Sequence, residues 1–350
     1  MAIYDIRPVK YTGGKMLILD QTRLPGKEVY EEMTTKEAVW DAIYRLKVRG
    51  APAIGVAAAY GLYLSVRDFC DGDISEFGRQ LREAKAYLVT ARPTAVNLAW
   101  ALDRMERAFD ELDTDEVSRA KEALFAEAER IREEDEAACR AMGEYGLSLL
   151  KPGMGILTHC NAGALATSRY GTCLSPIYLG QERGYDFRVF ADETRPLLLG
   201  ARLTSWELQK GGVDVTLICD NMASSVMSKG WIDAVVVGCD RMAANGDGAN
   251  KIGTSGVAIL AKEYGIPFYM YVPTSTIDLK TKTGGDIEIE LRSGEEIGRL
   301  WYERPMAPEN VKTYNPAFDV TSAEYITAVI TEKGIVRPPY GENLPKVFAR

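Results

Sequence analysis

Three residues with reactive side chains, Cys160, Asp240 and Lys251, directly follow distinctive stretches of the sequence. The cysteine ends the apolar run MGILTHC, the aspartate ends DAVVVGCD, and the lysine follows the Gly- and Asn-rich stretch NGDGAN. A carboxyl group that loses water when a site closes binds its proton more tightly, because desolvation disfavours the charged form, so Asp240 could act as an acid near neutral pH. The alternatives stay open: Asp240 could cap the following turn or helix, and Cys160 could be a small buried hydrophobic residue.

Basic residues at three places favour an anionic ligand. Lys251 lies in NGDGANKIGTSG, a predicted loop whose backbone N–H groups and positive charge suit a phosphate, although it could equally be a solvated loop. Arg49 precedes a predicted helix start that contains Pro52, and Arg92 precedes a helix start that Pro93 would open. A single arginine of this kind is usually a surface residue. Because helix N-termini and arginines both favour anions, the three together predict a polyanionic small molecule.

Several familiar sites are excluded by counting. His159 is the only histidine, which rules out H-E-x-x-H and Cys/His zinc patterns, and the sequence predicts no metal site. If the strand stays regular, His159 points away from the face of Cys160, and packing is its expected role. The sequence contains no G-x-G-x-x-G, which argues against a nicotinamide enzyme, and no G-x-x-x-x-G-K-[ST].

Charge and composition limit the partners and the compartment. A net charge of -8 argues against nucleic acid as a partner, because proteins that bind nucleic acids normally present a basic face. The segment GAPAIGVAAAYGLYLSV reads as a buried helix and not as a membrane span, and the start shows no secretory signal, so we expect a cytoplasmic protein. The six cysteines form no C-x-x-C pair and are expected to be reduced thiols: Cys70, Cys139, Cys160, Cys173, Cys219 and Cys239.

The chain changes character near residue 150. Before it, helical spacing dominates, as in Leu98, Leu102, Met105 and Phe109, and a longer charged helix from about residue 114 bridges to the next domain. After it, helix-like segments alternate with apolar runs: MGILTHC, FRVFADE, VTLICDN, DAVVVGCD and PFYMYVPT. This predicts an α/β fold, with a mainly helical domain with a short β-rich start over residues 1–145 and a Rossmann-like parallel sheet, buried on both faces, over residues 146–350.

The predicted sheet brings the chemical residues to one edge. Ligands of parallel sheets lie beyond the carboxyl ends of the strands. In this sequence those ends carry polar residues, namely Cys160 with Asn161, Asp192 with Glu193, Asp220 with Asn221, and Asp240. We therefore expect polar groups from separate strands to meet at this edge.

Long motifs resemble those of the methylthioribose-1-phosphate isomerase family. They are VRGAPAIG, ARPTAVN, THCNAGALATSRYGT, ETRP followed by GARLTSWEL, GCDRMAANGDGANKIGT, TYNPAFDVT and ITEKGIV, which occur in the family's order over nearly the whole chain. This family shares its fold with archaeal ribose-1,5-bisphosphate isomerases and with regulatory subunits of a translation-initiation exchange factor. The resemblance implies an aldose–ketose isomerase that acts on 5-methylthioribose 1-phosphate in methionine salvage, as a homodimer without cofactor.

The resemblance also implies roles for particular residues. Cys160 and Asp240 match the family's catalytic pair. Substrate contacts are implied for Arg49, Gly50, Ala51, Arg92, Asn250 and Lys251.

One position departs from the family. Leu199 stands where the family commonly has glutamine, just before the glycine of GARLT. An apolar side chain at this substrate-binding position makes 5-deoxyribose 1-phosphate, or another pentose 1-phosphate, the alternative substrate. A non-catalytic regulatory or nucleotide-sensing subunit is the alternative from another class, and the presence of Cys160, Asp240 and Lys251 together argues against it.

Overall fold

The computed structural model describes residues 5–70, 72–93 and 95–349, which group into two compact units. The helical unit comprises Asp5–Cys139 and Gly163–Gly171; the sheet unit comprises Arg140–Ala162 and the residues from Thr172 onward. Helix α5 (Val117–Leu147) begins in the helical unit and ends in the sheet unit, as expected for a bridging helix. The predicted α/β class is confirmed. The division after residue 145 stays a prediction.

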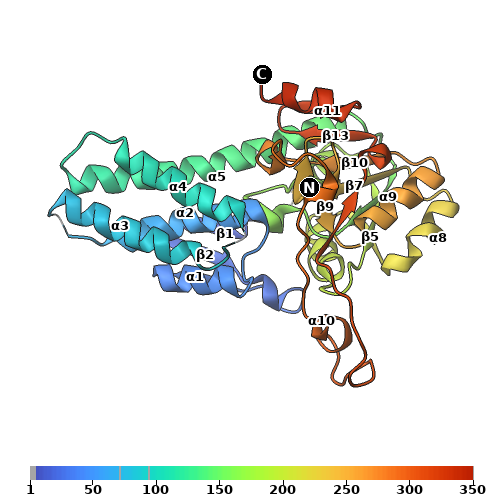
Figure 1. Cartoon of the computed structure of the whole chain (residues 1–350), viewed down its shortest axis with the longest axis horizontal. Helices are drawn as coiled ribbons and strands as arrows, with labels where there is room; N and C mark the ends of the chain where they lie inside the picture. The colour runs from blue at the N-terminus through green and yellow to red at the C-terminus, as the bar shows by residue number, and fades with distance from the viewer. Residues whose placement is uncertain (1–4, 71, 94, 350) are drawn as a thin grey trace. The chain divides into compact units, whose positions relative to one another are not determined.

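The helical unit opens with a small antiparallel sheet and continues as helices. Strands β1 (Val9–Thr12), β2 (Lys15–Leu19) and β3 (Tyr30–Met33) pair in that order. The helices of this unit are α1 (Lys36–Tyr44), α2 (Ala51–Arg67), α3 (Ile74–Val89), α4 (Val96–Asp110) and α5 (Figure 1). Thr35 and Asp73 cap α1 and α3 by accepting backbone N–H groups, which satisfies donors that a helix start leaves open.

Helix α2 is the centre of this unit. Its apolar residues, among them Val56, Tyr60 and Leu62, are buried in a core shared with α1, α3, α4 and α5. The prediction of a buried helix is confirmed, and within the described residues we find no helix long and apolar enough to cross a membrane. Helix α4 begins at Val96 and not at Pro93, which lies in the preceding turn. The predicted proline-opened start after Arg92 is therefore wrong.

The described residues of the sheet unit form a seven-stranded sheet in the order β14-β13-β10-β7-β4-β5-β6. Neighbours run parallel except for the β13–β14 pair. Strands β4 (Gly155–His159), β5 (Arg188–Asp192), β6 (Asp214–Ile218), β7 (Ala234–Gly238) and β10 (Phe268–Tyr271) confirm the five predicted runs. The sheet ends with β13 (Ala328–Thr331) and β14 (Gly334–Val336), and its connecting helices are α6 (Ser175–Glu182), α7 (Ser205–Lys210), α8 (Ala223–Ser228) and α9 (Thr254–Glu263).

Position in the sheet decides how deeply each strand is buried. Every residue of β4, β7 and β10 is buried, as predicted for strands covered on both faces. Strand β6 lies at the edge, and Leu217 within it is 49% exposed. The prediction that all five runs are buried on both faces is therefore wrong for β6, because an edge strand is covered less completely.

A second sheet forms where the sequence predicted only a loop. Strands β8 (Arg241–Ala243), β9 (Gly248–Lys251), β11 (Ile277–Asp278) and β12 (Phe318–Thr321) pair in the order β11-β8-β9-β12. An Asn245–Gly246 turn joins β8 to β9, and this dipeptide is typical of hairpins. The loop prediction for NGDGANKIGTSG is wrong because the hairpin signal and its pairing with β12 override the loop-like composition.

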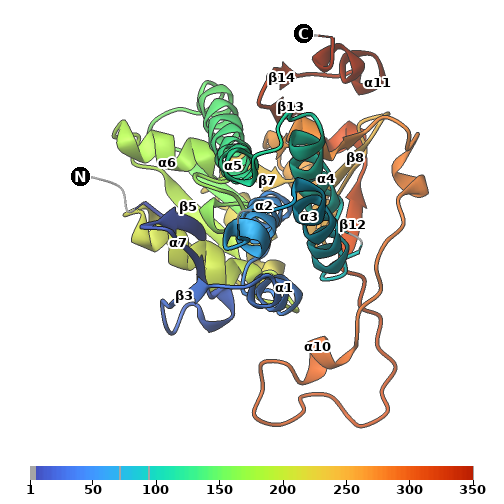
Figure 2. The same cartoon turned by 90° about the vertical axis from the view of Figure 1, so that its left-hand side faces the viewer.

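Between β11 and β12, the last strand of the second sheet, the chain leaves the body of the sheet unit. Residues 288–314, which we call the arm, extend outward and carry the short helix α10 (Glu295–Gly298) (Figure 2). The arm is tied to the unit by Trp301, whose Nε1 donates to the Pro196 carbonyl at 2.8 Å, and by Arg195, which donates to the Ile297 carbonyl at 2.6 Å. The chain then closes with α11 (Tyr340–Asn343).

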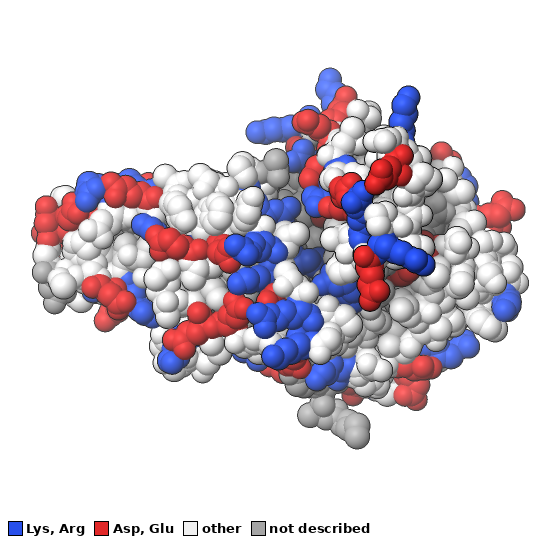
Figure 3. Space-filling model, turned by 90° about the horizontal axis from the view of Figure 1, so that it is seen from below, with Lys and Arg blue, Asp and Glu red and all other residues white. Residues whose placement is uncertain are grey.

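Charged side chains of both signs share the surface. The face in Figure 3 shows acidic and basic residues next to one another. Within the helical unit many are ion-paired, as Arg82 is with Glu106 at 3.0 Å and Arg79 with Glu76 at 2.6 Å. Such exposed pairs add little stability, but they divide the surface charge into small patches.

Candidate functional site

Cys160 and Asp240 follow neighbouring strands of the sheet. Starting from β4, the sheet grows in one direction with β5 and then β6. The later strands β7, β10 and β13 extend it on the other side of β4. Strands β4 and β7 therefore flank the point where the strand order reverses, the usual ligand site in such sheets. The register pairs His159 with Val237. Cys160 and Asp240 therefore both lie just beyond the carboxyl ends of adjacent strands.

The two side chains differ in their contact with solvent. Cys160 is half-buried and Asp240 is exposed. Strand β8 begins directly after Asp240, so no helix starts there for the aspartate to cap. Because Asp240 is open to water, the expected rise in its proton affinity requires a ligand that covers it.

Lys251 belongs to the second sheet and interacts electrostatically with Cys160 and Asp240. Only 8% of its surface is exposed, its Nζ donates to the Ala317 carbonyl at 2.8 Å, and it lies 4.1 Å from the centre of the Phe318 ring. Burial lowers the pKa of Lys251, while the negative charges of Cys160 and Asp240 raise it. Lys251 is thus a desolvated cation within electrostatic range of both predicted catalytic residues, and not part of a solvated loop.

Asn250 lies beside Lys251 in β9 and is also buried. Its Nδ2 donates to Thr254 Oγ1 at 3.0 Å, and Thr254 in turn donates to the Lys251 carbonyl at 2.6 Å. These bonds fix the end of β9 against the start of α9.

The other predicted contact residues lie in the helical unit. Arg49 and Arg92 are half-buried, and Gly50 and Ala51 form the start of α2. Gly50 has φ 86°, and a Cβ there would lie 2.4 Å from the Ala166 carbonyl oxygen. Only glycine fits this close approach, which brings the segment Gly163–Gly171 against the helix start. Arg49, Gly50 and Ala51 are therefore consecutive at one helix N-terminus, while Arg92 lies in a separate turn.

His159 is buried in a hydrogen-bonded network, which corrects its expected role as a packing residue. Its Nε2 donates to the Ile252 carbonyl at 2.8 Å, and its Nδ1 lies 3.0 Å from Asp192 Oδ2. Asp220 lies 3.9 Å away and accepts the backbone N–H groups of Thr194 and Arg195, each at 2.7 Å. Both ring nitrogens and the Asp220 carboxylate therefore have partners, and the cluster fits a structural ion pair better than a metal site.

Within this pair both pKa shifts have the same direction. The Asp192 carboxylate raises the pKa of His159 against the lowering effect of burial, and burial raises the pKa of Asp192. A group whose pKa is higher in the folded state adds stability that is fully present below its unfolded pKa and is lost as pH rises through the folded value. For Asp192 the loss begins near pH 4, and for His159 it extends above about pH 6.5.

We therefore expect Asp192→Asn to weaken the pH dependence of thermal stability. An asparagine Nδ2 can donate to Nδ1 while Nε2 still donates to Ile252, so the contacts are kept without the ionisable carboxyl. Between pH 5 and pH 8 the Tm of the wild type should fall by about 2 °C or more beyond that of the variant. Calorimetric scans across this range measure both, with exposed Asp186→Asn as the control. Parallel curves for all three proteins would contradict the expectation.

Leu199 is buried and directly precedes the π-helical turn η3 (Gly200–Thr204). At Gly200 a Cβ would lie 1.7 Å from the Asp192 carbonyl oxygen, so this turn sits directly against the end of β5. Leu199 thus presents an apolar side chain at a buried position beside the end of β5, whose neighbour in the sheet is β4.

A groove of about 450 Å³ lies beside His159. It is lined by His159, Asp220 and residues of α9 such as Val257 and Leu260, and its walls are mostly apolar. Neither Cys160 nor Asp240 lines it, so it is not the predicted site.

Thr194, Thr204 and Glu207 contribute buried polar groups around Cys160 that the sequence did not single out. All three lie in the quoted motifs ETRP and GARLTSWEL. Their types and spacing carry no signal of their own, because the π-helical turn that places Thr204 has no simple sequence pattern.

Comparison with known proteins places the chain among isomerases. A methylthioribose-1-phosphate isomerase from Symbiobacterium thermophilum is 66% identical over 348 residues, covering 99% of this chain and 97% of that protein. A 5-deoxyribose 1-phosphate isomerase from Petrotoga mobilis is 60% identical over 334 residues, covering 95% of this chain and 96% of that protein. The crystal structure of 5-methylthioribose 1-phosphate isomerase from Pyrococcus horikoshii OT3 matches with 44% identity and a TM-score of 0.94, covering 98% of this chain and 96% of that chain.

The family match covers most of the sequence. The model of the initiation factor 2 subunit family matches residues 47–338, which include Arg49, Arg92, Cys160, Asp240 and Lys251. The chain therefore belongs to the initiation factor 2 subunit family and, within it, to the methylthioribose-1-phosphate isomerase family.

Proposed function

We propose that this protein is an aldose–ketose isomerase that converts 5-methylthioribose 1-phosphate into 5-methylthioribulose 1-phosphate in methionine salvage. The observation that carries the proposal is the strand order: Cys160 and Asp240 follow the carboxyl ends of neighbouring strands, and Lys251 is in electrostatic range of both. Relatives that share 66% of their residues over nearly the whole chain carry this enzyme's name.

The reaction requires one proton to move between two oxygen atoms. The phosphate blocks the anomeric oxygen, so the ring opens only if the ring oxygen gains a proton. Hydrogen passes from C2 to C1, and the C2 hydroxyl loses the proton that the ring oxygen gains. The electrons stay within the sugar, and the net reaction needs no external oxidant, reductant or cofactor.

We assign the proton transfer to Asp240 and an assisting role to Cys160. A bound sugar would cover the exposed carboxylate, and the resulting desolvation would raise its proton affinity. The thiol, half-buried at the end of β4, would assist proton movement or shield the reacting carbons from water. Arg49, Gly50, Ala51, Arg92, Leu199, Asn250 and Lys251 are proposed to contact the sugar or its phosphate.

Lys251→Met and Arg49→Ala are expected mainly to weaken substrate binding. Each removes a charge-assisted contact of about 1.5 to 3 kcal/mol, which corresponds to a rise in KM of about 10- to 100-fold. Methionine keeps the packing of the buried lysine stem against Phe318. Steady-state kinetics measure kcat and KM, with exposed Lys282→Met as the control. A variant with wild-type KM and a lower kcat would show that its residue is misassigned.

A second substrate, 5-deoxyribose 1-phosphate, is favoured by two observations. The relatives at 55–60% identity include several named 5-deoxyribose 1-phosphate isomerase, and Leu199 offers only apolar contact where glutamine is common in the family. A regulatory subunit without catalytic activity is the remaining alternative, and the combination of thiol, carboxylate and buried lysine disfavours it.

The experiment that tests the function compares three sugars without added cofactor. We expect turnover of the 5-methylthio and 5-deoxy sugars and weak turnover of ribose 1-phosphate, because an unmade buried hydrogen bond costs about 1 to 3 kcal/mol. A fit for the thiomethyl group adds only about 1 to 3 kcal/mol of selectivity, so both apolar substrates should react. No turnover of any of the three would refute the proposed enzyme.

The same panel tests Leu199. In Leu199→Gln the kcat/KM for ribose 1-phosphate should rise relative to the two apolar sugars, since the amide can pair with a hydroxyl. Leu199→Met, which stays apolar at similar volume, is the matched control. An unchanged ranking in the glutamine variant would remove Leu199 from the specificity argument.

We also propose that the protein works in the cytoplasm as a homodimer. Its partner is a small-molecule substrate, with no nucleic acid or membrane partner. The boundary between its two domains is proposed to follow residue 145. Light scattering of the purified protein measures the molar mass directly. A mass of one chain across the working concentration range would contradict the dimer.

A further inference from the structure

Cys160 adopts an unusual backbone conformation. Its φ is 71°, in the left-handed region that residues with a Cβ seldom occupy. Strand β4 ends at His159, so the chain turns at Cys160. Conformations of this kind persist where the surroundings hold them, and they gather at functional sites.

Two threonine hydroxyls hold the peptide groups of Cys160. Its N–H donates to Thr194 Oγ1 at 2.9 Å, and its carbonyl accepts from Thr204 Oγ1 at 2.6 Å. Thr194 comes from the turn after β5, and Thr204 is the last residue of the π-helical turn η3. Both side chains are fully buried, so water does not compete for these bonds.

A second contact orients each hydroxyl. Thr194 Oγ1 donates to the Asp192 carbonyl at 3.1 Å, which leaves its lone pairs for the N–H of Cys160. Thr204 Oγ1 accepts from Asn161 Nδ2 at 3.1 Å, which directs its own proton to the Cys160 carbonyl. The two threonines therefore have opposite and defined roles, one as acceptor and one as donor.

Two acids support the threonines, the half-buried Asp220 and the buried Glu207. Thr194 is itself strained, with φ 60° on a β-branched residue, and Asp220 holds it by accepting its N–H and that of Arg195. On the other side Glu207 accepts from Asn161, and from the Tyr178 hydroxyl at 2.7 Å. Glu207 is fully buried. Neither network contributes an atom to the predicted substrate contacts.

We propose that Thr194 and Thr204 are positioning residues that hold Cys160 in its left-handed conformation, so that the thiol stays at the end of β4 within range of Lys251. The proposal rests on the proposed role of Cys160 in the isomerase reaction. Without the two hydroxyls, the peptide of Cys160 loses the bonds that oppose its strain and relaxes toward ordinary extended geometry, which turns the side chain away. A reacting group displaced by about 1 Å typically costs about 100-fold in rate.

The test replaces each hydroxyl with a methyl group of similar shape. Thr204→Val and Thr194→Val should lower kcat by about 100-fold and leave KM within about threefold, because the threonines do not touch the substrate. Alkylation of Cys160 by iodoacetamide, measured against exposed Cys70 in the same molecule, should slow by about threefold or more, since the charge of Lys251 no longer favours the thiolate. Thr204→Ser and Thr194→Ser keep the hydroxyl and should restore both values.

The matched control is Thr331→Val in β13. Thr331 is also fully buried, its Oγ1 donates to the Gly334 carbonyl at 3.0 Å, and it accepts the Lys333 N–H at 3.1 Å. This variant should lose a similar amount of thermal stability while keeping kcat and the alkylation rate of Cys160.

Three results would overturn the proposal. The first is a folded valine variant that keeps the wild-type kcat or the wild-type alkylation rate of Cys160. The second is a serine variant as impaired as its valine counterpart. The third is a loss of kcat in Thr331→Val equal to that in Thr194→Val or Thr204→Val. The two threonines are tested separately, so failure of one valine variant to fold leaves the other to decide. The alkylation rate does not depend on turnover, so an inactive wild type would refute the proposed function while this measurement still decides the positioning.

Discussion

Asp240→Asn is expected to lower kcat by about 10²- to 10⁴-fold while the protein remains folded. The amide has the shape of the carboxyl group but cannot take a proton from the C2 hydroxyl and return it to the ring oxygen. Asp240 is exposed and lies between β7 and β8, outside both strands, so we expect the sheet to remain folded after the exchange. KM should change less than kcat, because the proton is transferred only in the transition state and not in the bound substrate.

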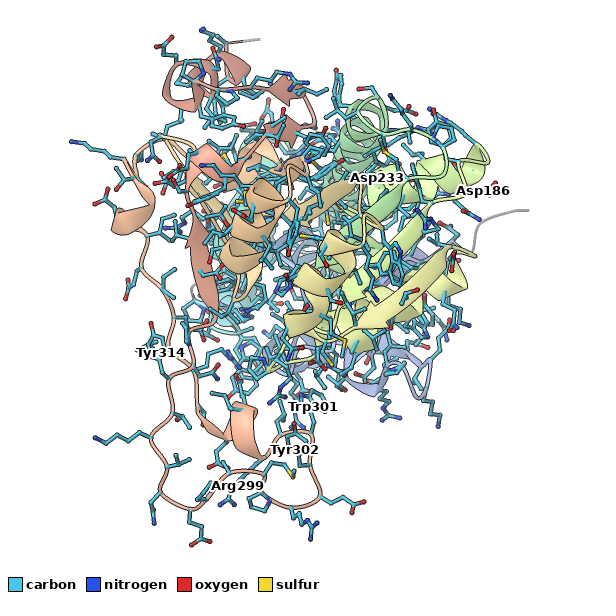
Figure 4. The ribbon with its side chains drawn as sticks, turned by 90° about the vertical axis from the view of Figure 1, so that its right-hand side faces the viewer. Asp186, Asp233, Arg299, Trp301, Tyr302 and Tyr314 are labelled. Carbon is cyan, nitrogen blue, oxygen red and sulfur yellow. The ribbon has the colours of Figure 1, made fainter. Side chains whose placement is uncertain are left out.

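The control for this variant is Asp186→Asn. Asp186, labelled in Figure 4, is exposed just before the amino end of β5, whereas Asp240 follows the carboxyl end of β7. Its φ of 50° suits asparagine equally well, and the change in net charge is the same. Steady-state kinetics and thermal melts on the two variants separate loss of the proton carrier from a general effect of charge. Wild-type kcat in Asp240→Asn would show that the carboxyl group is structural.

Cys160→Ala is expected to lower kcat by about 100-fold, at the lower end of the range for an acid–base group, because the thiol assists the proton transfer that Asp240 carries out. Bound substrate should also protect Cys160 from alkylation, since only a thiol within the site is covered by the ligand. Peptide mapping after iodoacetamide treatment, with and without substrate, measures this protection residue by residue.

Other thiols provide the controls for that measurement. Cys70 is exposed in the helical unit, so its alkylation should not depend on substrate, and Cys70→Ala should keep full activity. Burial raises the pKa of Cys173 to about 12 and that of Cys239 further, so neither should react at neutral pH. Equal inactivation with and without substrate would show that the reactive thiol lies elsewhere.

The central strands and the reactive residues that follow them could be predicted from the amino-acid sequence. The runs ending in Cys160 and Asp240 are continuous and apolar because central parallel strands are buried on both faces, and such runs can be recognised without a structure. The helical pattern of α4 and the buried character of α2 could be read for the same reason, since spacing and composition are local properties. The resemblance of the motifs to a known family implied roles that spacing alone left open.

Which of these residues are neighbours in space could not be predicted from the sequence and became clear from the folded chain. Strand order depends on how whole segments pack, so nothing in the two runs indicates that β7 returns to the side of β4. Pairing with β12 turned a predicted loop into β9 and buried Lys251, because backbone hydrogen bonds to a distant strand outweigh local composition. The left-handed Cys160, the two threonines that hold it and the ion pair of His159 arise in the same way, from contacts between segments 30 or more residues apart.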